Sequence, residues 1–240
     1  MRNILLEIEY DGTDYFGWQY QPQKRTVQGA IENALNKILQ EPIPLVGASR
    51  TDAGVSALSQ CANFLTNSRL SVRAIQAALN SLLPRDIYIK NAYGVHLLFN
   101  ARFNAKSKIY RYQIIFGRSP LHQRFAWELK YPLDLLKMER AANLFVGERD
   151  FRPFCDIKNS QVDGSINVTE LKILADENTT ILIEANRFLY KMVRRIVGCL
   201  VEVGRGKITK NDIIKNLAGR SHPSFIVAPA QGLILLSVKY

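Results

Sequence analysis

The chain has 240 residues, of which 47% are hydrophobic and 22% are charged, and its 32 Lys and Arg residues outnumber its 21 Asp and Glu residues by 11. This length suits one large domain or two ordinary ones. The surplus of positive charge favours a polyanionic partner, because Lys and Arg displace counterions when they meet phosphates.

The usage of cysteine and histidine argues against a disulfide framework and against a metal site. Cys61, Cys155 and Cys199 are far apart without a C-x-x-C pair, and the three histidines do not cluster. The first residues alternate like a strand instead of forming a signal peptide, and no apolar run approaches the ~18 residues of a membrane span. We therefore expect a cytoplasmic protein that uses no metal, cofactor or membrane anchor.

The first half of the chain alternates strands with helices. Its expected elements are a strand at 3–10, a helix at 26–39, strands at 45–46 and 60–66, a helix at 71–83 and a strand at 86–95. Thr26 and Ser71 would cap the two helices. This βαββαβ order is that of the ferredoxin-like split unit.

The same order returns after Lys108. The expected elements are a strand at 109–116, a helix at 132–145, a hairpin of strands at 167–174 and 180–184 that turns at 176–178, helices at about 186–203 and 209–218, and a strand at 233–239. The sequence thus predicts an α+β fold of two ferredoxin-like halves, residues 1–104 and 105–240. Their sheets and helices are expected to form a central basic cleft.

The stretch LVGASRTDAGVSA, from Leu45 to Ala57, is the main candidate for chemistry. A polar turn that contains Arg50 and Asp52 lies between Gly47 and Gly54, and these glycines are expected to let the backbone bend through positive φ. The turn would present Asp52 as a nucleophile, a general base or a gate that repels anions. An ordinary turn, in which the Asp side chain caps its own backbone, is the alternative that spacing alone favours.

Within this stretch, ASRTDAGVSA resembles the signature of the tRNA pseudouridine synthase A family, usually written G-R-T-D-x-G-V-H-A. The resemblance implies that Asp52 is the catalytic nucleophile. Ser49 and Ser56 stand where the family usually has Gly and His. These departures concern the shape of the loop and leave the Arg-Thr-Asp core in place.

Five further stretches resemble blocks of the same family in the same order, and they extend the resemblance over nearly the whole chain. They are YDGTDYFGWQYQP, ARFNAKSKIYRY, ERDFRPF, MVRRIVG and APAQGLILLSVKY. Asn100 and Arg149 stand where His is usual. In the first block, Tyr15 and Trp18 could stack on bases, although local packing is the simpler interpretation.

These blocks assign roles to side chains outside the Asp52 loop. By resemblance, Tyr110 stacks on the target base and is a candidate for proton handling, Arg194 pairs with Asp52, and Leu233 lies beneath the flipped base. Arg50 is placed to fill the space that the uridine vacates or to hold the displaced backbone. Strand alternation also puts Tyr110 on the same face as Tyr112.

A basic stripe is expected on the helix at 186–203. Arg187, Lys191 and Arg194 recur at the spacing of one helix face and would bind phosphates. The opposite face would be apolar, with Leu189, Val193, Ile196 and Leu200. A structural helix with a solvated face is the alternative.

The resemblance implies an isomerase that breaks the C1′–N1 bond of uridine, rotates the uracil and rejoins it through C5. Its substrate would be tRNA, at positions 38, 39 and 40 of the anticodon stem-loop, and its active form a homodimer. Asp52 could add to C6 of uracil or attack C1′ of the ribose, and the sequence leaves both open.

Two other classes of protein are weighed against this enzyme. A non-catalytic RNA-binding paralogue on the same fold is disfavoured by the retained Arg-Thr-Asp core, Tyr110 and Arg194. An unrelated nucleotide-binding enzyme is disfavoured because the sequence has no phosphate loop of the G-x-x-x-x-G-K-[ST] type.

Overall fold

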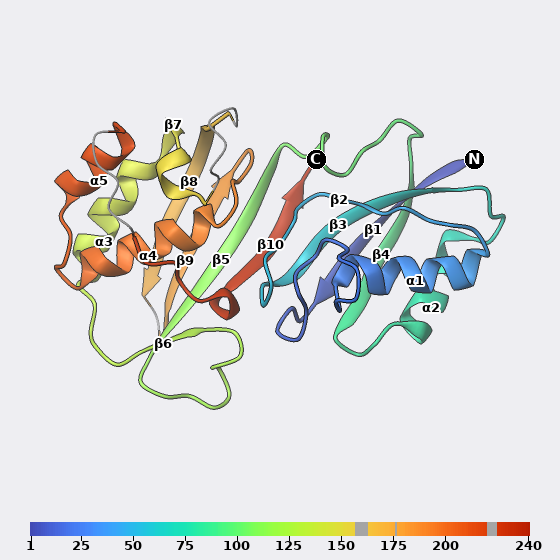
Figure 1. The fold of residues 1–240 in the computed structure, drawn as a ribbon, viewed down its shortest axis with the longest axis horizontal. Helices are drawn as coiled ribbons and strands as arrows, with labels where there is room; N and C mark the ends of the chain where they lie inside the picture. The colour runs from blue at the N-terminus through green and yellow to red at the C-terminus, as the bar shows by residue number, and fades with distance from the viewer. Residues whose placement is uncertain (157–162, 176, 220–224) are drawn as a thin grey trace. The chain divides into compact units, whose positions relative to one another are not determined.

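The computed structural model describes residues 1–156, 163–175, 177–219 and 225–240 (Figure 1). Asp176, in the predicted turn, and His222 lie outside them. The chain forms two compact units, one of Met1–Lys106 with Ile234–Tyr240 and the other of Ser107–Leu233. Both combine strands with helices, which confirms the predicted α+β class. A division into compact units does not show which segments fold independently. The domains at 1–104 and 105–240 therefore stay predictions, and so does the central basic cleft.

The first unit has the predicted order of elements up to Val95, and it also includes the last strand of the chain, which was expected among the elements after Lys108. Its elements are β1 (Arg2–Tyr10), α1 (Val27–Leu39), β2 (Val46–Gly47), β3 (Ser56–Thr66), α2 (Val72–Leu82), β4 (Ile87–Val95) and, at the end of the chain, β10 (Leu233–Lys239). β1 lies between β3 and β4 and is antiparallel to both, and β2 is antiparallel to β3. This pairing is consistent with the predicted ferredoxin-like arrangement. β10 adds to it by pairing in parallel with β3.

Local side-chain chemistry explains where the two helices of this unit begin. The hydroxyl of Thr26 accepts a hydrogen bond from the backbone N–H of Gly29, and that of Ser71 accepts one from Ala74. Both caps confirm the sequence prediction. The helices pack against each other, and their apolar residues join those of β1 in the core. The residues of this core that are fully buried include Ile4, Leu6, Ile8, Ile31, Leu35, Ile75 and Leu79.

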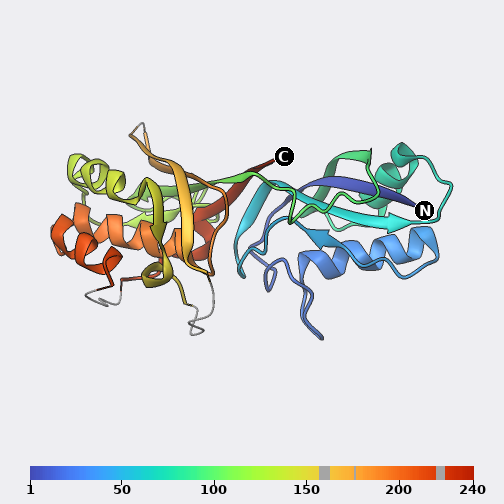
Figure 2. The same ribbon diagram turned by 90° about the horizontal axis from the view of Figure 1, so that it is seen from above.

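The second unit is built on a sheet with the order β5-β9-β8-β7. Its strands are β5 (Ser107–Phe116), β6 (Trp127–Leu129), β7 (Gly147–Asp150), β8 (Ser165–Ala175) and β9 (Thr179–Ala185), and its helices are α3 (Leu135–Ala142), α4 (Met192–Gly204) and α5 (Lys210–Leu217). The neighbours within the sheet order are antiparallel, whereas β6 is parallel to β5. α3 packs against α4 and against β8 (Figure 2).

The helix predicted at 186–203 begins later than expected. Lys191 is the N-cap residue of α4, with φ of 59° in the left-handed region, so Arg187 and Lys191 precede the helix. The side-chain oxygen of Asn186 accepts hydrogen bonds from the backbone of Arg187 and Asn167, and such bonds compete with helix formation. The prediction of a helical stripe through Arg187, Lys191 and Arg194 was therefore wrong. The prediction that Leu189 belongs to the apolar face of the helix was wrong for the same reason.

Other helix ends lie close to their predicted positions. α3 begins at Leu135 instead of Pro132, because the carboxylate of Asp134 caps its first turn. Thr209 and Asp212 form a reciprocal capping box at the start of α5. Among the described residues, no helix combines the length and the apolar character that a membrane span requires.

Candidate active site

Asp52 lies on the loop that joins β2 to β3 in the first unit. The residue is half-buried, whereas Arg50 is exposed. The backbone N–H of Val55 donates a hydrogen bond to the Asp52 carbonyl at 3.2 Å, and Gly54 has φ of 79°. The predicted tight turn is therefore present, and Gly54 supplies the positive φ that it needs.

Gly47 does not have a positive φ, so that prediction was wrong. A glycine is needed there because another side chain packs closely against its Cα. Gly47 lies in β2, and a Cβ atom built on it would be 2.5 Å from the indole nitrogen of Trp18. Trp18 is 2% exposed and its ring centroid is 6.0 Å from that of Tyr10. Tyr15 is 3% exposed. Tyr15 and Trp18 thus both pack locally, as the simpler interpretation predicted.

The loop of residues 11–25, here called the N-terminal loop, lies directly against the Asp52 loop. Two hydrogen bonds join the two loops, from Trp18 N–H to the Thr51 carbonyl at 3.1 Å and from Gly54 N–H to the Tyr15 carbonyl at 3.3 Å. A third runs from Gly12 N–H to the hydroxyl of Ser56, the first residue of β3, at 3.0 Å. Ser56, which replaces the usual His, is thus one of the contacts. Sequence reasoning missed this brace, although it had singled out both loops.

Side chains from β1 and β3 hold the first part of the Asp52 loop. Gln60 is fully buried and bonds both to the backbone N–H of Ser49, at 3.2 Å, and to its carbonyl, at 2.9 Å. The hydroxyls of Tyr10 and Thr51 lie 2.7 Å apart. The backbone on either side of Arg50 is therefore fixed by buried partners, which gives Asp52 a defined position in its unit.

Gly12→Ala is expected to destabilise the protein by displacing the Asp52 loop. A Cβ atom built on Gly12 would be 2.0 Å from the carbonyl oxygen of Val55, so the two backbones must move apart. Overpacking of this kind costs about 1–3 kcal/mol. Gly94→Ala is the matched control, since nothing lies within 4 Å of a Cβ atom there. Urea unfolding would compare them, and equal stability of the two variants would contradict the close approach.

In the second unit, Tyr110 and Tyr112 share one face of β5, as predicted. Tyr110 is 5% exposed, and its ring meets that of Phe188 edge to face with centroids 5.0 Å apart. Tyr112 is fully buried and donates a hydrogen bond to the Pro229 carbonyl at 2.8 Å. Sequence reasoning missed Phe188, because nothing in the spacing of the two segments indicates that they meet.

Arg194 lies in the first turn of α4 and is tied to the segment before β10. Its Nε donates to the Ala228 carbonyl at 2.7 Å, and the N–H of Ala228 donates to the Arg194 carbonyl at 3.1 Å. A Cβ atom built on Gly198 would be 1.9 Å from the carbonyl oxygen of Ile226, so this segment lies against the helix. Leu233, which follows it, is 6% exposed.

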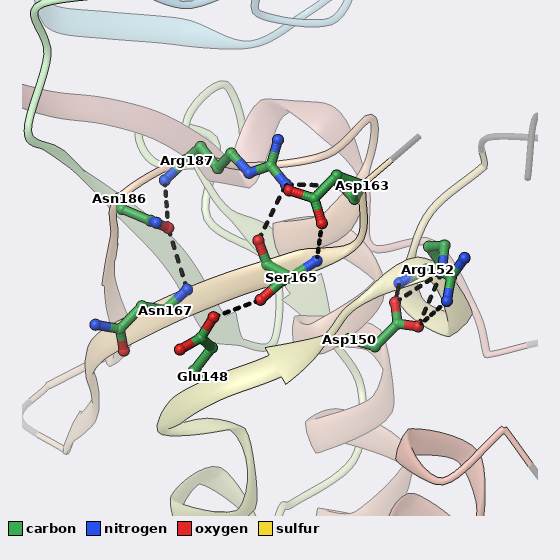
Figure 3. Close-up of polar contacts among 8 residues, drawn as sticks. All are labelled: Glu148, Asp150, Arg152, Asp163, Ser165, Asn167, Asn186 and Arg187. Carbon is green, nitrogen blue, oxygen red and sulfur yellow. Dashed lines mark hydrogen bonds and ion pairs between the residues drawn. The ribbon is translucent and has the colours of Figure 1, made fainter. Parts of the chain in front are cut away.

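Acidic side chains hold the two cations that precede α4. Arg187 forms an ion pair with Asp163 and donates to the carbonyls of Asp163, at 2.8 Å, and of Ser165, at 3.0 Å (Figure 3). Lys191 forms an ion pair with Asp156 at 2.7 Å. These contacts give both cations a structural role that sequence reasoning missed, and their binding to RNA stays a prediction.

Asp156 also pairs with Arg195, and we expect Asp156→Asn to weaken the start of α4. The hydrogen bond from Lys191, with that from Arg195, holds the pKa of Asp156 below its ordinary value against the effect of burial. A lowered pKa means that the carboxylate stabilises the fold above about pH 4 and loses this contribution as pH falls through the folded-state pKa.

The variant should therefore lose on the order of 1 kcal/mol at pH 7 and show a flatter decline in stability below pH 4. Urea unfolding of the variant and of the natural protein, at pH 7 and at several pH values below 4, measures these differences in stability. Glu170→Gln, which removes the exposed ion pair with Lys172, should change neither value. If the free energy of unfolding of Asp156→Asn falls with pH in parallel with that of the natural protein, the carboxylate does not stabilise the fold through its ion pairs.

The model of the tRNA pseudouridine synthase family matches residues 7–104 and 141–240. The chain belongs to this family. Two relatives called tRNA pseudouridine synthase A support the assignment. The one from Thermoanaerobacter sp. (strain X514) is 42% identical over 245 aligned residues, and the one from Caldicellulosiruptor bescii is 44% identical over 245. Each comparison covers the whole of both chains.

Membership of the pseudouridine synthase family confirms the predicted family and the predicted class of enzyme, an isomerase. Of the candidate residues, Tyr110 lies outside the matched ranges, and the others lie inside them, namely Arg50, Asp52, Arg187, Lys191, Arg194 and Leu233. No group of three or more His, Cys, Asp or Glu side chains in the described part of this synthase is arranged to hold a metal ion.

Proposed function

We propose that this protein converts uridine to pseudouridine in tRNA and that Asp52 is its nucleophile. The observation that best supports this proposal is the turn at Asp52. Hydrogen bonds with the N-terminal loop fix its backbone, so the carboxylate has a defined position in a chain of this family. The carboxylate adds to C6 of uracil or attacks C1′ of the ribose, and the C1′–N1 bond breaks. The uracil then turns so that C5 bonds to C1′, and the bond to the Asp52 carboxylate breaks, which returns the free carboxylate. The proton lost from C5 balances the proton gained at N1.

Four other side chains complete the proposed site, on the strength of the family motifs. Arg194 pairs with the Asp52 carboxylate and orients it. Tyr110 stacks on the base and helps to remove the proton from C5, while Leu233 lies beneath the flipped uracil. Arg50, which is exposed, fills the space that the uridine leaves or holds the displaced backbone. Extruding the uridine costs a few kcal/mol, which contacts of this kind must offset.

The proposed substrate is the anticodon stem-loop of tRNA, at positions 38, 39 and 40, bound by a homodimer in the cytoplasm. The support is the family motif together with a net charge of +11, which suits a polyanion. Stem RNA offers phosphates and shape more than readable base edges, so cations suffice to bind it. Arg187 and Lys191 are proposed to contribute phosphate contacts when RNA competes with their carboxylate partners.

Three tRNA transcripts, each with a single uridine among positions 38, 39 and 40, test the proposed specificity. Mapping of pseudouridine after incubation should find the modified base at the one uridine present in each transcript. Modification outside the stem-loop, or at only one of the three positions, would overturn the proposed range while leaving the reaction class in place.

Tyr110→Phe should slow the reaction greatly and leave tRNA affinity almost unchanged. The variant keeps the ring and its edge-to-face contact with Phe188 but loses the hydroxyl, which is the proton-handling group. A general acid or base contributes about 10²–10⁴-fold to rate. Tyr112→Phe, on the same face of β5, is the control. An equal loss of rate and of affinity would mean that the hydroxyl of Tyr110 mainly holds RNA.

A further inference from the structure

Asp86 forms a polar cluster with two residues of the N-terminal loop. It lies between α2 and β4 in the first unit, and its Oδ1 accepts a hydrogen bond from the Tyr15 hydroxyl at 2.5 Å. Its Oδ2 accepts one from Arg25 at 2.7 Å. The guanidinium of Arg25 also lies over the Tyr15 ring, 4.2 Å from its centroid. One carboxylate thus joins residues from both ends of the loop.

The backbone of Asp86 adds a fourth connection, because its carbonyl accepts a hydrogen bond from Asp11 N–H at 3.0 Å. Tyr15 is 3% exposed. Burial raises the pKa of Tyr15 well above its ordinary value, and the hydrogen bond to Asp86 acts in the same direction. The hydroxyl therefore stays a neutral donor to the carboxylate throughout the pH range in which enzymes work.

Tyr15 connects this cluster to the Asp52 loop. Its carbonyl accepts the hydrogen bond from Gly54, two residues beyond Asp52. On the other side of Asp52, the Thr51 carbonyl accepts from Trp18, and a Cβ atom built on Gly17 would be 2.7 Å from that same oxygen. A movement of Tyr15 would therefore shift the backbone that follows the nucleophile, and the neighbouring residues Gly17 and Trp18 contact the backbone that precedes it.

We propose that Asp86 is a positioning residue for Asp52 and acts through Tyr15. The inference rests on the proposed role of Asp52. Stability alone explains the cluster poorly, because the side chains of Arg25 and Asp86 are 46% and 22% exposed, and such pairs add 0–1 kcal/mol. The strand beside Asp86 has its own anchors, since Asn80 bonds to both the N–H and the carbonyl of Ile89. In contrast, a shift of 1 Å at a reacting group can cost about 10²-fold in rate.

The test compares Asp86→Ala, Asp86→Asn and Tyr15→Phe by single-turnover rate at saturating tRNA and by the dissociation constant for tRNA. Asp86→Ala should lower the rate at least tenfold and change the dissociation constant less than about twofold. Asp86→Asn keeps an oxygen that accepts from Tyr15 and should recover most of the rate. Tyr15→Phe should match Asp86→Ala, and combining the two should add little, because both break one connection.

Glu7→Ala is the matched control. Glu7 is another partly exposed carboxylate in this unit, and it accepts hydrogen bonds from Ser59 and Asn91, each at 2.8 Å. Its loss should leave the rate unchanged. An equal fall in rate for Glu7→Ala, or a changed dissociation constant with an unchanged rate for Asp86→Ala, would overturn the positioning role.

Amide hydrogen exchange separates this inference from the proposed function. In Asp86→Ala the amides of residues 50–55 should exchange faster than in Glu7→Ala, whether or not the protein modifies RNA. Unchanged exchange there would overturn the inference even in an active enzyme. If these amides exchange faster in Asp86→Ala but the natural protein forms no pseudouridine, the role of Asp86 in holding the loop is retained and the proposed chemistry is refuted.

Discussion

Asp52→Asn is expected to abolish pseudouridine formation while the protein still folds and binds tRNA. Asn keeps the size and shape of Asp, but its neutral amide is a poor nucleophile. The turn is held by backbone hydrogen bonds of Val55, Gly54 and Trp18, none of which needs the carboxylate. We expect a rate loss of about 10⁴-fold or more, the scale seen when one member of a catalytic set is removed.

Single-turnover kinetics on a tRNA transcript and a binding measurement separate chemistry from affinity for this variant. Asp150→Asn is the control, because Asp150 pairs with exposed Arg152 and belongs to no candidate site. It should react at the natural rate. Activity of Asp52→Asn near that of the natural protein would remove Asp52 from the mechanism.

Arg194→Ala is expected to lower turnover even when tRNA is saturating. If Arg194 pairs with Asp52, its removal leaves a carboxylate without its cation, a defect of roughly 3–5 kcal/mol when such a pair is buried. Each 1.4 kcal/mol corresponds to about tenfold in rate. Arg194→Lys should recover only part of the loss, because an ammonium does not reproduce the planar fork of a guanidinium.

The neighbouring cation supplies the control for Arg194. Arg195 lies in the same turn of α4 but pairs with Asp156, so Arg195→Ala should cost stability and spare the maximal rate. Single-turnover rate is measured against tRNA concentration for each variant. A natural maximal rate for Arg194→Ala, reached only at higher tRNA concentration, would show that Arg194 contacts RNA and does not act on Asp52.

Much of the fold follows from signals that act within a few residues. Thr26, Ser71 and Thr209 mark helix starts because their hydroxyls cap backbone N–H groups three residues on. The strand at 233–239 was predicted with its observed bounds. α4 was misjudged because apolar periodicity continues back beyond Met192, whereas the bonds of Asn186 keep the preceding backbone out of the helix.

The sequence proposes the candidate residues, but it does not predict the contacts that hold them in the structure. Asp52 stands out because glycine and a polar turn surround it. The brace from the N-terminal loop runs mostly through backbone groups, which leave no mark in a sequence except small residues such as Gly12 and Gly17. Lys191 was assigned to RNA because its partner Asp156 lies 35 residues away, where no spacing rule connects them.

The most direct test of the central claim is incubation of the protein with an unmodified tRNA transcript, followed by mapping of pseudouridine and measurement of the RNA mass. Our account predicts pseudouridine in the anticodon stem-loop and an unchanged mass, because the reaction only moves the bond at C1′ from N1 to C5. Binding of the transcript without any pseudouridine would contradict it and would identify the protein as a non-catalytic RNA-binding member of the family.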